Sequence, residues 1–256
     1  MTRMSRREVL ALLASGQEPG GGVITEARLA GLPEPVRRYL NYGQVVGKAP
    51  IRTVGLKQRG AMLMEKGAKW LPMAAEQYFT TNPPGFLWYG TLHPFPIVSV
   101  SARDRYADGH GSLWIQALSL IPLGTARGLE VDQGELLRYL GEMAWFPTAL
   151  LSDAIQWEAI DAERARATIS LAPVTASGIL HIDGQGRYTR FTAERYREEH
   201  KRLVPRPWTG RWEDYREIKG FRIPMRAEAA YTLESGEFSY FRGEVTDIGY
   251  NVPLPY

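Results

Sequence analysis

The chain has 256 residues, of which 44% are hydrophobic and 23% charged, and its net charge is +3. This is ordinary globular composition, which excludes a disordered chain, a collagen-like chain, a coiled-coil filament and a polybasic surface. The chain contains no cysteine, which excludes disulfide bonds, thiol catalysis and cysteine-ligated zinc.

The segment Met4–Leu10 is similar to a twin-arginine export signal. The apolar stretch that follows, Val9–Ala14, is shorter than the roughly 7–15 residues that such a signal needs. Ser5 as an N-cap, with Glu8 three residues later, forms a capping box and predicts a short helix instead. We therefore expect a cytoplasmic protein, with export through a twin-arginine-like N-terminus as the alternative.

The glycines Gly20–Gly22 form the clearest linker in the sequence. They predict two parts: residues 1–22 as an N-terminal helix and flexible arm, and residues 23–256 as a single domain. Within that domain, Leu32–Leu40 is expected to form a second short helix, because Pro35 suits its first turn.

From Thr53 onward the apolar residues recur with a period of two, and turn residues such as Asn82-Pro83-Pro84-Gly85 separate the runs. This pattern predicts about twelve short antiparallel strands. The expected strands are Thr53–Glu65, Ala68–Thr80, Phe86–Leu92, Ile97–Tyr106, Ser112–Leu120, Ile155–Ile160, Arg166–Ala172, Ser177–Ile182, Arg187–Arg197, Trp208–Ile218, Arg222–Leu233 and Glu237–Tyr250.

One substantial helix interrupts these strands. Asp132 is its expected N-cap, with Glu135 three residues later, and Leu136 and Leu140 belong to an apolar stripe at helical spacing. Pro147 is expected to kink or end it. A sheet of about twelve strands must curl, and the inside of the curl must be filled. We therefore expect a mainly β fold, in which a large curved antiparallel sheet or half-barrel wraps around this amphipathic helix.

Three stretches together resemble a bacterial family of unknown function whose architecture is similar to the LolA and LppX lipoprotein-carrier half-barrels. They are Arg138–Leu151 with Trp157–Asp161, Arg103–Tyr106 with Gly109 and Gly111, and Gly220–Pro224 with Gly236 and the closing strand to Asn251. The resemblance covers roughly Leu32 to Asn251. It implies an open curved sheet, a helix across its concave face and a cavity suited to acyl chains. It brings no catalytic residues.

Two patterns bear on such a cavity. Arg138, Glu142 and Trp145 share one side of the predicted helix, either as an exposed salt-bridged face or at a cavity mouth where they hold a polar headgroup. The expected strand Trp208–Ile218 is polar on both faces, which suits a curled sheet with a polar-lined cavity or, equally, an edge strand.

The resulting hypothesis is a protein that binds a lipid-like or other hydrophobic small molecule in a cavity between sheet and helix. The expected ligand-binding residues are Gln77, Trp88, Tyr106, Arg138, Glu142, Trp145 and Trp212. One alternative is a hydrolase- or lyase-type enzyme that uses Asp104 or Glu142 in the same cavity. A second alternative is a structural or interaction module with a filled core.

No catalytic residue, metal ligand or cofactor is assigned, because the sequence has no phosphate-binding glycine motif and no histidine pair at metal-site spacing. We expect no nucleic-acid partner, because basic and acidic residues are interleaved. No transmembrane segment is expected either, since the longest mostly apolar run, Leu113–Leu123, is interrupted by Gln116 and Pro122. Peripheral membrane contact and the oligomeric state stay open.

Overall fold

The computed structural model describes residues 6–17, 22–95, 98–117 and 121–251. Four helices are present in this part of the chain: α1 (Arg6–Ser15), α2 (Glu26–Leu29), α3 (Glu34–Tyr42) and α4 (Leu129–Glu142). Two short 3-10 helices, Met143–Trp145 and Pro147–Leu151, follow α4. The strands are β1 (Thr53–Met62), β2 (Leu71–Thr81), β3 (Pro84–Phe95), β4 (Val98–Ala107), β5 (His110–Ala117), β6 (Ile121–Ala126), β7 (Ile155–Ala159), β8 (Arg164–Leu171), β9 (Val174–Ile182), β10 (Tyr188–Glu199), β11 (Arg202–Ile218), β12 (Phe221–Leu233) and β13 (Gly236–Tyr250).

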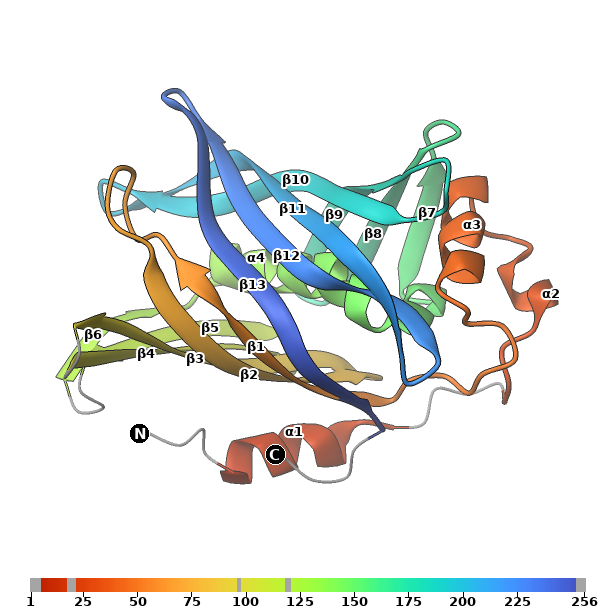
Figure 1. Cartoon of the computed structure of the whole chain (residues 1–256), viewed down its shortest axis with the longest axis horizontal. Coiled ribbons are helices and arrows are strands. Elements are labelled where there is room, and N and C mark those ends of the chain that lie inside the picture. The colour runs from red at the N-terminus through yellow and green to blue at the C-terminus, as the bar shows by residue number, and fades with distance from the viewer. Residues whose placement is uncertain (1–5, 18–21, 96–97, 118–120, 252–256) are drawn as a thin grey trace.

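All the strands belong to one antiparallel sheet, in the order β6-β5-β4-β3-β2-β1-β13-β12-β11-β10-β9-β8-β7. Two meanders, β1–β6 and β7–β13, therefore meet where β1 pairs with β13, with Val54 opposite Tyr250. The sheet curls around α4, which lies inside the curl (Figure 1). The expected mainly β half-barrel around one central helix is confirmed.

Two details of the sheet differ from the sequence expectation. Strand β6 was not predicted, because Pro122 and Gly124 interrupt its apolar pattern. The edge-strand interpretation of Trp208–Ile218 is wrong, since β11 lies between β10 and β12. Asp214 within β11 has a φ of 57°, and the alternation of side chains is interrupted there.

As a result, Trp212 and Tyr215 both lie among the interior aromatic side chains, although they are an odd number of positions apart along the strand. Trp212 packs edge to face against Trp145, with ring centroids 5.1 Å apart. The hydroxyl of Tyr215 donates a hydrogen bond to the carbonyl of Tyr188, at 2.7 Å.

Helix α4 begins about one turn earlier than the sequence predicts. Gly128, not Asp132, is the N-cap, and Asp132 lies buried in the first turn. Its carboxylate accepts a hydrogen bond from the backbone N–H of Gly111, at 2.7 Å, and so holds the start of the helix against β5. A side chain at Gly111 would collide with the helix backbone, because a Cβ there would lie 2.8 Å from the carbonyl oxygen of Val131.

The aromatic ring of Phe191 fixes the other side of α4. This fully buried ring lies between Gly141 of α4 and Gly178 of β9. A Cβ at Gly178 would lie 2.1 Å from the tip of the ring, and a Cβ at Gly141 would lie 3.0 Å from its edge. Because both sides are occupied, the ring cannot move to admit a larger residue.

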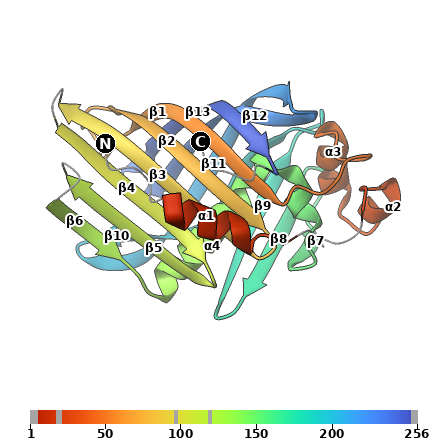
Figure 2. The ribbon, with the colours of Figure 1, turned by 90° about the horizontal axis from the view of Figure 1, so that it is seen from below.

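Helix α1 packs on the outer, convex face of the sheet, across β2 and β3 (Figure 2). Its side chains Val9, Leu12 and Leu13 are buried in a small apolar cluster with Tyr78, Leu87 and Ala107. Glu8, the expected capping-box residue, forms an ion pair of 2.5 Å with Arg103 of β4. The expected N-cap Ser5 and most of the expected linker Gly20–Gly22 lie outside the described residues.

We predict that Gly178→Ala lowers the free energy of unfolding by about 1–3 kcal/mol, since it overpacks the contact with Phe191. The matched control is Gly184→Ala in an open turn, where no atom lies within 4 Å of the new Cβ. It should change stability by less than about 0.5 kcal/mol. Urea denaturation of the two variants measures the difference, and equal stability would contradict the packing described here.

Candidate functional site

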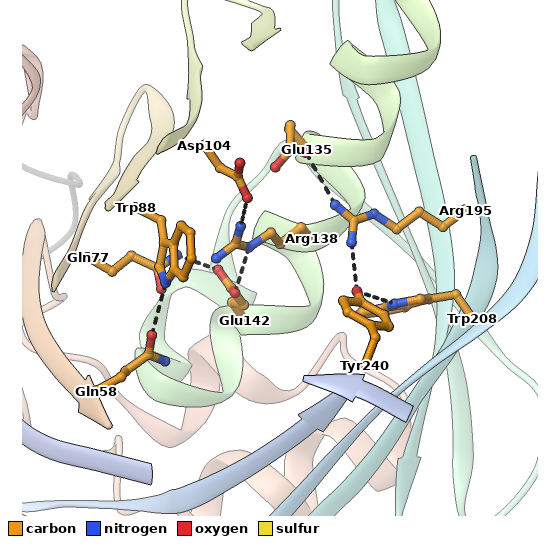
Figure 3. Close-up of polar contacts among 10 residues, drawn as sticks. All are labelled: Gln58, Gln77, Trp88, Asp104, Glu135, Arg138, Glu142, Arg195, Trp208 and Tyr240. Carbon is orange, nitrogen blue, oxygen red and sulfur yellow. Dashed lines mark hydrogen bonds and ion pairs between the residues drawn. The ribbon is translucent and has the colours of Figure 1, made fainter. Parts of the chain in front are cut away.

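A cluster of buried polar side chains joins α4 to the concave face of the sheet (Figure 3). Arg138 is at its centre and is only 14% exposed. Its Nε donates a hydrogen bond to Oε1 of Glu142, at 2.8 Å, and its Nη1 forms an ion pair with Asp104 of β4. The guanidinium also lies over the rings of Phe86 and Trp88, 5.0 and 5.3 Å from their centroids.

Two glutamines extend this cluster across the first meander. Nε2 of Gln77, on β2, donates a hydrogen bond to Oε2 of Glu142, at 2.7 Å. The indole N–H of Trp88, on β3, donates to Oε1 of Gln58, on β1, at 3.1 Å. Neighbouring residues of a strand point to opposite faces of the sheet, and each of these side chains occupies a position that points inward.

A second ion pair joins α4 to the other meander. Arg195 of β10 donates a hydrogen bond to Oε1 of Glu135, at 3.2 Å. It also donates to the hydroxyl of Tyr240, at 3.2 Å, and the indole N–H of Trp208 donates to the same hydroxyl, at 3.0 Å. We name Gln77, Asp104, Glu135, Arg138, Glu142 and Arg195 the α4 polar cluster.

The charges of the α4 polar cluster do not balance when every group is ionised, because three carboxylates face two guanidinium groups. The pKa of Glu135 is raised to about 7, chiefly by burial and next by the nearby carboxylate of Asp104, against the opposing effects of Arg195 and Arg138. The pKa of Arg138 is raised above its ordinary value, since Glu142 and Asp104 outweigh the effect of burial. Glu135 therefore exchanges a proton near neutral pH.

Three oxygens of the α4 polar cluster have no hydrogen-bond partner among the described residues. They are Oε1 of Gln77, Oδ1 of Asp104 and Oε2 of Glu135. Buried polar atoms are normally satisfied, and each exception calls for an explanation. These three oxygens can accept hydrogen bonds from a bound molecule or from water.

The expected site residues fall into two groups. Gln77, Trp88, Arg138 and Glu142 lie together in or beside the α4 polar cluster. Trp145 and Trp212 instead pack against each other, and the indole N–H of Trp145 donates to the carbonyl of Pro224.

Tyr106 is fully buried on β4, and its hydroxyl has no hydrogen-bond partner among the described residues. Arg138 and Glu142 do not form the exposed face that was the alternative interpretation of their spacing, because only 14% and 12% of their side chains are exposed.

Sequence reasoning missed Glu135 and Arg195. Glu135 was assigned to the capping of the helix, and only the earlier start of α4 places it inside the curl. Arg195 follows the buried Phe191 at an even spacing along β10, so strict alternation assigns it to the concave face. That alternation was the available signal.

Beyond the α4 polar cluster, the concave face continues as two apolar walls. On the first meander, the aliphatic wall comprises Met62, Leu71, Met73, Leu92 and Ile115. On the second meander, the aromatic wall comprises Trp208, Tyr231, Phe238 and Tyr240. The rings of Tyr231 and Tyr240 stack with centroids 5.4 Å apart.

The carboxylates considered for acid–base chemistry are not arranged as a pair free to act on a substrate. Asp104 and Glu142 both bind Arg138. Among residues 6–17, 22–95, 98–117 and 121–251, no group of three or more histidine, aspartate or glutamate side chains could hold a metal ion. Within the same ranges, no helix has the length and apolar character needed to cross a membrane.

We predict that Arg138→Met lowers the free energy of unfolding by about 3–5 kcal/mol, because it leaves two buried carboxylates without their cation. Arg166→Met is the control, since Arg166 forms an exposed ion pair with Glu158 and should cost less than about 1 kcal/mol. Chemical denaturation at pH 7 compares the two. Similar losses for both variants would show that the buried pairs contribute no more than surface pairs.

A second prediction concerns pH. The pKa of Glu135 is raised in the folded protein to about 7 from an ordinary value of 4.5, so the folded state retains this proton longer than the unfolded chain. The stability that this proton contributes is complete below about pH 4.5 and is lost as the pH rises through about 7.

Glu135→Gln should therefore remove a decline in stability between pH 5 and 7, which the difference between wild-type and variant unfolding curves measures. Glu130→Gln, in the exposed first turn of α4, is the control and should retain the decline. Parallel pH profiles for the wild type and Glu135→Gln would contradict this prediction.

Similar proteins were found among solved structures and among family models. The chain matches a LolA superfamily protein from Nitrosomonas europaea at 16% identity and a TM-score of 0.41, over 86% of this chain and 94% of that one. It also matches a domain described as an outer membrane lipoprotein-sorting protein from Vibrio parahaemolyticus, at 9% identity and a TM-score of 0.43, over 79% of this chain and 87% of that one. No curated protein matches. Residues 22–243 match the Family of unknown function (DUF6544), and the chain therefore belongs to that family.

Proposed function

We propose that this protein binds a hydrophobic, lipid-like small molecule on the concave face of its sheet, between the aliphatic and aromatic walls and next to the α4 polar cluster. One observation carries the proposal: a few buried polar groups, three of them with unpartnered oxygens, converge inside a largely apolar half-barrel. Binding sites for small molecules have this character, with apolar surroundings and few polar groups that fix the orientation.

The composition of the two walls supports the proposal energetically. Removing an alkyl chain from water contributes about 0.8 kcal/mol for each methylene group. The aliphatic wall includes Met62 and Met73, and methionine adapts its shape to irregular apolar partners. The aromatic wall adds large ring surfaces whose polar atoms bond to other protein groups, as those of Trp208 and Tyr240 do.

The surroundings of the walls support it as well. The β1–β2 and β10–β11 hairpins and strand β6 lie at the same end of the half-barrel (Figure 1). This end carries exposed apolar side chains at Met64, Ile121, Leu123 and Leu203. Such a rim suits a hydrophobic molecule that enters from this end, including one that leaves a membrane surface.

The decisive experiment is native mass spectrometry of the freshly purified protein, with organic extraction of any molecule that travels with it. The expected result is a stoichiometric hydrophobic passenger, or formation of a 1:1 complex after incubation with fatty acids or phospholipids. If the measured mass remains that of the free protein after incubation with the fatty acids and the phospholipids, the proposal is overturned. It would favour instead the filled-core module or the enzyme that uses Asp104 or Glu142.

We further predict that Met62→Gln weakens binding of an alkyl ligand about tenfold, because it replaces part of the aliphatic wall with an amide. Met64→Gln is the matched control, two residues further along the chain, where the side chain is 53% exposed. It should bind as the wild type does. Displacement of a fluorescent fatty acid measures both affinities, and an equal affinity for the two variants would remove the aliphatic wall from the site.

A further inference from the structure

Arg197 lies on the concave face, one inward position beyond Arg195 along β10. The strand is regular here, since Arg195 pairs with Arg206 and Arg197 with Val204 on β11. Residues two apart on a strand face the same side, so Arg197 points into the curl. Its side chain is partly buried against the aromatic wall.

The aromatic wall forms a platform beneath the Arg197 guanidinium. Its carbon lies 4.9 Å from the ring centroid of Phe238 and 5.6 Å from that of Tyr231. Both rings stack on Tyr240, and the hydroxyl of Tyr231 donates to the carbonyl of Tyr196, at 3.2 Å. A guanidinium that stacks through its face keeps its N–H groups free at the edge.

Among the described residues Arg197 has no carboxylate partner, in contrast to its neighbours Arg195 and Arg206 on the concave face. Arg195 bonds to Glu135, and Arg206 bonds to both oxygens of Glu199, at 3.0 and 2.7 Å. Arg197 lies near enough to Glu199 to lower its pKa together with Arg206, but it forms no ion pair with any described residue. Arg197 therefore carries a positive charge beside the apolar walls that no carboxylate of the described residues neutralises by direct contact.

We propose that Arg197 binds the anionic headgroup, a carboxylate or a phosphate, of the hydrophobic ligand. This inference rests on the proposed function and makes it specific: the ligand is an anionic amphiphile, and its chain lies along the apolar walls. A planar guanidinium matches the two oxygens of either group, which favours bidentate binding. Arg138 and Arg195, whose ion pairs are already formed, hold α4 in place instead.

The test compares three ligands with one chain length: dodecanoate, dodecyl phosphate and dodecanol, titrated at pH 8 and followed by calorimetry. The wild type should bind the two anions at least tenfold more tightly than the alcohol. Arg197→Gln should lose this preference and keep its affinity for dodecanol, which shows that the variant is folded. Arg59→Gln is the control for net charge, since Arg59 is exposed on the opposite face of β1, and it should retain the preference.

The outcomes separate the two proposals. Equal wild-type affinity for dodecanol and dodecanoate, or an unchanged preference in Arg197→Gln, would overturn the role of Arg197 and leave the hydrophobic site standing. Binding of none of the three ligands would overturn the proposed function and the inference with it. Inorganic phosphate serves as the competitor: full displacement of dodecyl phosphate at equal concentration would mark a site for free anions and overturn the assignment to an amphiphile.

Discussion

The pairing of buried charges along α4 holds the two halves of the sheet around one helix. Arg138 connects the helix to the first meander through Asp104, and Glu135 connects it to the second through Arg195. A helix enclosed by a half-barrel faces protein on every side, so a charged face is tolerated only where each charge meets a partner. The apolar stripe then packs toward β9 and β10, where Phe191 sets the distance between helix and sheet.

Under the proposed function, the groups for binding and the groups for stability are separated within one concave face. The ion pairs of Arg138 and Arg195 lie where the helix crosses, and their removal should cost mainly stability. The guanidinium of Arg197, which has no carboxylate contact among the described residues, lies further along β10 on an aromatic platform that orients it without neutralising it. A binding group gains from a fixed orientation, because less rotamer entropy is lost when the ligand arrives.

The sequence predicts the architecture well because its signals are local. Period-two alternation and turn residues locate twelve of the strands, and an apolar stripe locates α4. The errors arise where a distant contact decides. Pro122 and Gly124 weaken the pattern of β6, which forms only because β5 offers an edge. The sequence pattern assigns Glu135 to helix capping. In the structure, the contact of Asp132 with Gly111 sets the start of the helix instead. The ion pairs that α4 forms with β4 and β10 leave no local trace, because their partners lie far apart in the chain.

The seam between β1 and β13 has a consequence for how the chain reaches this shape. Each meander consists of hairpins that close over short connections, whereas the seam brings together residues from the two ends of the described domain. The side chain of Asn251, for example, accepts a hydrogen bond from the backbone of Arg52. Contacts between neighbours in sequence form early, and those across long loops form late, because closing a long loop costs more chain entropy. We therefore expect the concave face to be completed late in folding, when the two meanders join edge to edge.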